Sequence, residues 1–127
     1  MKERPIDSPM RILLLEDDPA DVELCIHALK QALTCDVAVA QSPEAFQNAI
    51  ARQQPEVIVS DSGVLGMTGL EALKMAKAKF PDVPFIMCSA NNSPARIAQV
   101  LEMGADRFVS KDARFQLLVQ EIKRLGS

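Results

Sequence analysis

Short apolar runs alternate five times with amphipathic stretches along this chain, and this alternation restricts the possible folds more than any other feature. Two of the runs, Ile12–Leu15 and Phe85–Cys88, are apolar at every position. Continuous runs of this length are typical of strands buried on both faces, which occur mainly in parallel sheets. The predicted strands are Arg11–Leu15, Val37–Ala40, Val57–Ser60, Val83–Cys88 and Arg107–Ser110.

The stretches between these runs have apolar residues at the spacing of an α-helix. Three begin with a capping side chain before a proline, in the pairs Asp18-Pro19, Ser42-Pro43 and Ser93-Pro94. Gly104 is placed where a glycine ends a helix. Five strands alternating with five helices predict an α/β fold with a doubly wound parallel sheet. The helical stripes are Val22, Ile26, Leu29 and Leu33; Phe46, Ala49 and Ile50; Leu70, Leu73 and Phe80, with Lys77; Ile97, Val100 and Leu101; and Leu118, Ile122 and Leu125.

The composition fits one soluble globular domain and disfavours several classes of partner. The 127 residues suffice for a single domain, predicted over residues 10–125 after a flexible leader at residues 1–9. A net charge of −3 and the lack of Trp and Tyr argue against direct binding of nucleic acid. No apolar segment approaches the length of a membrane span or a signal sequence, so we expect a cytoplasmic protein. The oligomeric state stays open, with a dimer as one alternative.

The thiols and the imidazole of the chain are not spaced as metal ligands. Cys25, Cys35 and Cys88 are isolated, and His27 is the single histidine. Each cysteine lies in an apolar stretch, which favours a buried, reduced thiol over a redox role. We expect His27 to be a side chain on a helix surface.

Polar side chains gather at the carboxyl ends of the predicted strands, where open parallel α/β sheets form their sites. Carboxylates crowded together repel one another, and a divalent cation with an ammonium group relieves that repulsion. Oxygen ligands without His or Cys suit Mg²⁺ or Mn²⁺ and disfavour zinc. A carboxylate beside such a cation, as at Asp61, is a candidate nucleophile toward phosphorus. The residues are Glu16, Asp17 and Asp18 after the first strand, Asp61 after the third, Ser89 after the fourth, and Ser110 and Lys111 after the fifth.

The order of these residues resembles the response regulator receiver (CheY-like) family. The resemblance covers about Met10–Leu125 and is carried by four features in order. It implies a flavodoxin-like, five-stranded parallel sheet with strand order 2-1-3-4-5 and a role in two-component signal transduction. The features are Glu16-Asp17-Asp18, Asp61 followed by Gly69, Ser89-Ala90, and Lys111.

The resemblance also implies how the site works. Asp61 would accept a phosphoryl group from a histidine kinase or phosphotransfer protein, with Lys111 as its cationic partner. Glu16, Asp17, Asp61 and the backbone carbonyl of Gly63 would hold the Mg²⁺. Such a chain catalyses only its own phosphoryl transfer and autodephosphorylation, so it is expected to be a signalling protein and not an enzyme.

A conformational switch is implied as well. The hydroxyl of Ser89 would follow the new phosphoryl group, and Phe108 would turn inward into the space left by the loop. The surface formed by the fourth helix, the fifth strand and the last helix would then change most. Gly63 and Asn91 flank the site and are expected to tune hydrolysis.

The sequence departs from the family pattern at three positions. Leu65 stands where proline is usual, and Val64 where methionine is frequent. Asp112 replaces the proline that usually follows the lysine, which leaves the conformation of the Lys111-Asp112 peptide open. Asp112 could instead cap the last helix.

Three other functions are weaker alternatives. A degenerate receiver would bind a partner without phosphorylation, but the full set of polar groups at the strand ends disfavours it. A flavin-binding protein of the same fold would need an anion-binding loop, and the acidic loop at Glu16 repels anions. A phosphatase would need a second carboxylate two residues after Asp61, where Gly63 stands. Two contexts stay open, a stand-alone regulator and a receiver that is part of a longer chain. The ending Ser110-Lys111-Asp112, followed by Leu118, Ile122 and Leu125, resembles the amino-terminal receivers of larger sensor or output proteins.

Overall fold

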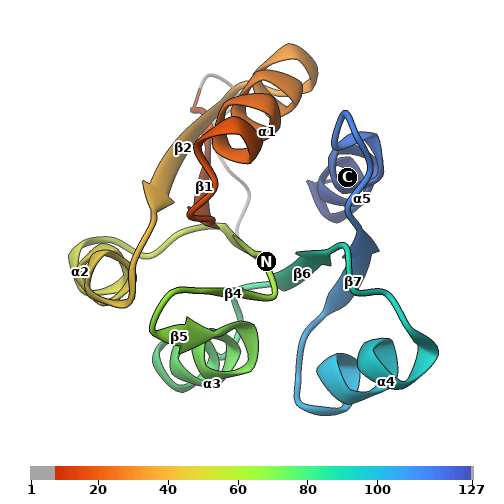
Figure 1. Ribbon diagram of the computed structural model, residues 1–127. Helices are drawn as coiled ribbons and strands as arrows, with labels where there is room; N and C mark the ends of the chain where they lie inside the picture. The colour runs from red at the N-terminus through yellow and green to blue at the C-terminus, as the bar shows by residue number, and fades with distance from the viewer. Residues whose placement is uncertain (1–7, 127) are drawn as a thin grey trace.

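In a computed structural model, which describes residues 8–126, five strands form one parallel sheet in the order β2-β1-β3-β6-β7 (Figure 1). The strands are β1 (Met10–Leu15), β2 (Cys35–Ala40), β3 (Val57–Ser60), β6 (Phe85–Ser89) and β7 (Arg107–Ser110). Five helices within the same residues connect them: α1 (Pro19–Ala32), α2 (Pro43–Arg52), α3 (Gly69–Lys79), α4 (Pro94–Glu102) and α5 (Gln116–Gly126). β6 and β7 are the fourth and fifth strands of this sheet along the chain. The predicted fold class and the predicted strand order 2-1-3-4-5 are therefore confirmed.

The sheet is covered on both faces, which explains its continuously apolar strands. Helices α1 and α5 cover one face, and α2, α3 and α4 cover the other (Figure 1). Along β1 the side chains alternate between the two cores: Ile12 and Leu14 face α1 and α5, whereas Leu13 and Leu15 face the opposite helices. A strand in this position needs apolar residues at every position, because both of its faces are removed from water.

The predicted caps begin three of the helices. The side chains of Asp18, Ser42 and Ser93 accept hydrogen bonds from the first-turn N–H groups of α1, α2 and α4. These bonds satisfy donors that a helix leaves unpaired at its start. Gly104 follows α4 with a φ of +113°, a conformation in which glycine is favoured.

Other boundaries differ from the sequence prediction. β2 starts two residues earlier than predicted, and β6 runs from Phe85 to Ser89 and not from Val83. Helix α3 starts with a capping box between Thr68 and Glu71, for which no start was predicted. The segment after Asp61 contains a small antiparallel hairpin of β4 (Gly63–Val64) and β5 (Met67–Thr68), for which no strands were predicted.

The buried stripe of α1 is also shifted from the predicted one. Cys25, Ala28 and Leu29 are fully buried, whereas Val22 and Ile26 are only half-buried. This helix packs against both the sheet and α5, so its most buried side chains face the seam between them. The periodicity located a buried stripe, but packing against a second helix decided which residues formed it.

The predicted leader lies largely outside the described residues, and its flexibility stays a prediction. Within residues 8–126, no helix has both the length and the apolar composition that crossing a bilayer requires.

The three cysteines are buried and unpaired, as predicted, and His27 is exposed on α1.

We expect truncation of Leu118 to destabilise the protein far more than truncation of its neighbour Leu117. Both are on α5, but Leu118 is fully buried and Leu117 is 44% exposed. Leu118→Ala leaves a cavity and should lower the free energy of unfolding by about 2–5 kcal/mol. Urea unfolding followed by circular dichroism measures both variants. Equal losses for Leu118→Ala and Leu117→Ala would contradict the assigned orientation of α5.

We also expect the thiols to be protected until the protein unfolds. Burial raises the pKa of Cys25 to about 12, and burial likewise raises the pKa of Cys88 to about 12. Both thiol pKa values are higher in the folded state than in the unfolded state. The contribution of the protonated thiols to stability is therefore fully present near neutral pH, below the pKa of the unfolded chain. This contribution should decline as the pH rises from about 9 toward about 12.

Labelling with iodoacetamide at pH 8, read out by peptide mass spectrometry, tests this protection. We expect slow labelling of the native protein and rapid labelling in urea. Equal rates in the two states at Cys25 or Cys88 would show that these thiols are accessible.

Candidate functional site

The polar residues that follow the strands meet at one edge of the sheet. The parallel register places Leu15 beside Ser60 and Ser89 beside Ser110, so the residues that come next leave the sheet at similar levels. The backbone bonds continue past the strands: the N–H of Asp61 donates to Leu15, and that of Lys111 donates to Ser89, each at 3.0 Å.

Three carboxylates form a cluster with the composition of a hard-cation site. Oxygen atoms of Glu16, Asp17 and Asp61 all lie within 4.8 Å of one another. Ligands on opposite sides of Mg²⁺ are about 4.2 Å apart, twice its bond length to oxygen. A small approach of these side chains, or a bridging water, would bring the cluster to that spacing. The predicted carboxylate ligands therefore lie together and fit an oxygen-binding cation, whereas the role of the Gly63 carbonyl stays a prediction.

Lys111 is held by carboxylates from three separate segments. Its Nζ donates to Glu16 Oε1 at 2.9 Å and to Asp21 Oδ2 at 3.0 Å, and lies 3.3 Å from Asp61 Oδ1. Burial disfavours the ammonium charge, but the bonds to Glu16 and Asp21 and the charge of Asp61 outweigh burial and raise the pKa of Lys111. The amine therefore remains charged over the physiological range.

Glu16 is the buried acid of the cluster, with 3% of its surface exposed. Its Oε1 accepts from Lys111, and its Oε2 accepts from the backbone N–H of Asp18 at 3.2 Å. Burial raises the pKa of Glu16, and these two bonds offset that rise only in part. Both oxygens of Glu16 already accept a hydrogen bond. Glu16 therefore holds Lys111 in place and also contributes negative charge to the cation site.

The sequence analysis missed Asp21. This residue lies in the first turn of α1, and its carboxylate accepts a hydrogen bond from Lys111 Nζ. The only sign of Asp21 in the sequence was that a further acidic residue follows Glu16-Asp17-Asp18 closely. A helix-start acid is common for electrostatic reasons alone, so sequence offered no way to pair it with Lys111.

The segment after Asp61 is packed closely beneath the site. The N–H of Gly69 donates to the carbonyl of Ser62 at 2.7 Å. A Cβ at Gly69 would lie 2.8 Å from that carbonyl oxygen and 2.9 Å from the carbonyl oxygen of Asp61. Only glycine fits here without displacing backbone. The hairpin also reaches the acidic cluster, since the N–H of Leu65 donates to Asp17 Oδ2 at 3.3 Å.

The residues predicted to act in a switch lie at the ends of β6 and β7. Ser89 is 1% exposed, and its hydroxyl oxygen accepts from the N–H of Asn91 at 3.0 Å. Phe108 is half-buried on β7 and packs against the core beneath α2, α3 and α4. Asn91 is exposed in the loop before α4. Their positions allow the predicted roles, which stay predictions.

The segment after Lys111 shows both the conformation of the Lys111-Asp112 peptide bond and the role of Asp112. There is no cis peptide bond among residues 8–126, so the Lys111-Asp112 bond is trans. The carboxylate of Asp112 accepts from the N–H groups of Gln116 and Leu117 at 3.0 and 3.2 Å. Asp112 therefore caps α5, as the sequence analysis suggested. Phe115 before the helix has a φ of +56°, which its burial in the core compensates.

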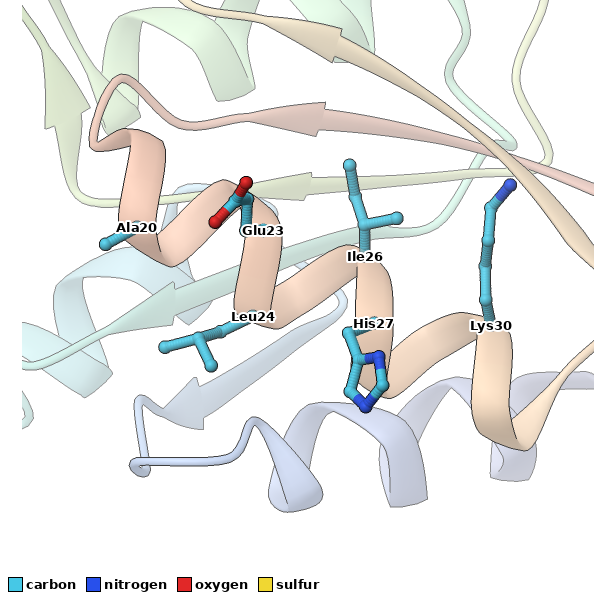
Figure 2. A pocket seen from close by; sticks show the side chains of 6 residues that line it. All are labelled: Ala20, Glu23, Leu24, Ile26, His27 and Lys30. Carbon is cyan, nitrogen blue, oxygen red and sulfur yellow. The ribbon is translucent and has the colours of Figure 1, made fainter.

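A shallow hollow lies elsewhere, along α1 (Figure 2). It contains none of the residues that bind Lys111. Its lining residues are Ala20, Glu23, Leu24, Ile26, His27 and Lys30.

The sequence is similar to a known family over most of its length. The family profile described as response regulator receiver domain matches residues 12–123. The two-component response regulator ARR9 of Arabidopsis thaliana is 31% identical over 85% of this chain, and the nitrate/nitrite response regulator protein homolog of Haemophilus influenzae is 26% identical over 92%. The chain spans only 56% and 57% of these two relatives, so it corresponds to about half of each.

Solved structures give the same result. The response regulator TrrA of Thermotoga maritima, in complex with Mg²⁺ and beryllofluoride, is 25% identical, with a TM-score of 0.80 over 91% of this chain and 98% of that one. The signal receiver domain of a signal transduction histidine kinase from Syntrophus aciditrophicus is also 25% identical, with a TM-score of 0.78 over 91% and 88% of the two chains.

We expect Asp17→Asn to weaken Mg²⁺ binding by at least roughly tenfold, because it removes a charged oxygen ligand from the cluster. Asp18→Asn is the matched control: it removes the adjacent charge, but asparagine caps α1 equally well. Isothermal titration calorimetry suits the measurement, since the chain has no Trp or Tyr to report binding by fluorescence. Similar Mg²⁺ affinities for the two variants would exclude Asp17 as a ligand.

Proposed function

This chain belongs to the response regulator receiver domain family, and from that premise we propose that it accepts a phosphoryl group on Asp61 in a Mg²⁺-dependent reaction. The observation that carries the proposal is the short distance of 3.3 Å between Lys111 Nζ and Asp61 Oδ1 in the acidic cluster. Receiver domains are signalling domains and not enzymes in the usual sense.

The proposed transfer uses Asp61 as the nucleophile. One carboxylate oxygen forms a bond to phosphorus while the bond from phosphorus to the donor breaks, and its electron pair leaves with the donor. For a phosphohistidine the leaving atom is an imidazole nitrogen. Lys111 stays charged and faces the developing charge on the phosphoryl oxygens, while the fixed strand ends position the reacting carboxylate.

We assign the cation to Asp17 and Asp61, with Glu16 beside them and the Gly63 carbonyl as a further ligand. Bound there, Mg²⁺ would neutralise charge on the phosphoryl oxygens. The observation in favour is the all-oxygen character of the cluster.

We further propose that water later attacks the phosphorus of the acyl phosphate. The bond from phosphorus to the Asp61 oxygen breaks, inorganic phosphate leaves, and Asp61 returns to its free carboxylate. Gly63 and Asn91 are the candidates for tuning this reaction.

The proposed switch begins at Ser89. A phosphoryl group on Asp61 offers new acceptor oxygens to the Ser89 hydroxyl, which lies buried at the neighbouring strand end. Movement of Ser89 would draw in the exposed segment from Ala90 to Pro94. Phe108 is half-buried and can then turn inward, which changes the surface formed by α4, β7 and α5.

The partners in this proposal are a histidine kinase or phosphotransfer protein upstream and an output domain or protein downstream, in the cytoplasm. Receiver domains of response regulators interact with both kinds of partner, and the relatives named above are longer than this chain. A constitutive interaction module is not favoured, since no phosphate-handling side chain is missing from the site.

We expect the protein to gain the mass of one phosphoryl group when incubated with acetyl phosphate and Mg²⁺. Asp61→Asn should abolish the gain because it removes the nucleophile, and EDTA should prevent it. Asp18→Asn serves as the control and should be phosphorylated like the wild type. Intact-mass spectrometry provides the measurement. Undiminished phosphorylation of Asp61→Asn would refute the assignment of Asp61.

A further inference from the structure

Asp21 is a fourth carboxylate at the proposed site and is outside the acidic cluster. It approaches from α1 and binds Lys111 Nζ at 3.0 Å. Its side chain is 27% exposed, against 4% for Glu16. Asp21 thus shares the lysine with the two acids at the strand ends, but it is more accessible to water than Glu16.

The ammonium of Lys111 has three N–H donors and three carboxylate partners, Glu16, Asp21 and Asp61. On phosphorylation Asp61 loses its own carboxylate charge, so one phosphoryl oxygen can take over its contact with Lys111. A second phosphoryl contact with the ammonium requires that Glu16 or Asp21 yields. Glu16 is buried and bound at both oxygens, so losing Lys111 would leave a buried charge poorly compensated. Asp61 itself carries the phosphoryl group. Asp21 is the partner that water can most easily solvate after release.

Building on the proposed phosphorylation of Asp61, we propose that Asp21 is a positioning residue that competes with the phosphoryl group for Lys111. While Asp21 holds the ammonium, part of the positive charge at the site is neutralised. The acidic cluster then attracts a cation more strongly, and an anionic group on Asp61 is held less strongly. Asp21 would thus raise the affinity of the site for the metal ion and lower its affinity for a phosphoryl group.

This role predicts opposite effects on two ligands. Asp21→Asn removes the competing charge, so Mg²⁺ should bind more weakly while beryllofluoride, an anionic mimic of the phosphoryl group, should bind more tightly. We expect each affinity to change by roughly threefold to tenfold, the size of one partly exposed charge interaction. A residue that only stabilised the start of α1 would not change the two affinities in opposite directions.

The test compares three variants with the wild type. Glu23→Gln is the matched control, because Glu23 is an exposed acid of the same helix and lies apart from the Lys111 contacts. Asp21→Glu keeps the charge and should restore wild-type behaviour. Calorimetry gives the Mg²⁺ affinity without a phosphoryl mimic, NMR titration at saturating Mg²⁺ gives the beryllofluoride affinity, and urea unfolding gives the stability.

The outcomes separate this inference from the function on which it rests. A wild type that binds neither beryllofluoride nor a phosphoryl group refutes the proposed function. A wild type that binds beryllofluoride, with Asp21→Asn matching Glu23→Gln for both ligands, refutes the role of Asp21 alone. Parallel weakening of both ligands together with lower stability would also overturn it, since that pattern marks a structural residue. Opposite shifts in Asp21→Asn, absent from Glu23→Gln, support the inference.

Discussion

The arrangement of the site depends on one ammonium group shared by three carboxylates. Lys111 follows the last strand, yet its partners Glu16 and Asp21 lie 95 and 90 residues earlier in the chain. Without this cation, the acids gathered at the edge of the sheet would repel one another in surroundings that are partly removed from water. The parallel sheet brings these distant segments to one edge, and Lys111 offsets part of their mutual repulsion there.

The surroundings of Lys111 combine fixed and movable parts. On one side, Glu16 is buried and tied to the backbone of Asp18, and Gly69 packs against the carbonyl oxygens beneath Asp61. On the other side, the segment from Ala90 to Pro94 is exposed and is joined to the strand ends by two hydrogen bonds, from the Asn91 N–H to the Ser89 hydroxyl oxygen and from the Asn92 side chain to Ser110. A phosphoryl group on Asp61 would therefore be attached to a firmly positioned side chain and would lie near a loop that can respond. This arrangement suits a receiver domain.

Much of this arrangement could be predicted from sequence because its causes are local. Strands such as Ile12–Leu15 lie between two layers of helices and are apolar at every position, so the pattern itself indicates the parallel sheet. Asp18, Ser42 and Ser93 each cap a helix within three residues of their own position. Once the strands are placed, topology requires their carboxyl ends to share an edge, which brings Asp61 and Lys111 together.

The remaining features were decided by contacts between distant segments. Asp21 resembles any acid in the first turn of a helix, and only the hydrogen bond between α1 and the segment after β7 gives it Lys111 as a partner. The buried stripe of α1 is set by its contact with α5, and Glu16 is held by the distant Lys111 as well as by the nearby N–H of Asp18. Sequence by itself determined the fold and which side chains reach the edge of the sheet. The tertiary structure decided how those side chains pair, because pairing depends on distances of a few ångströms that local periodicity does not encode.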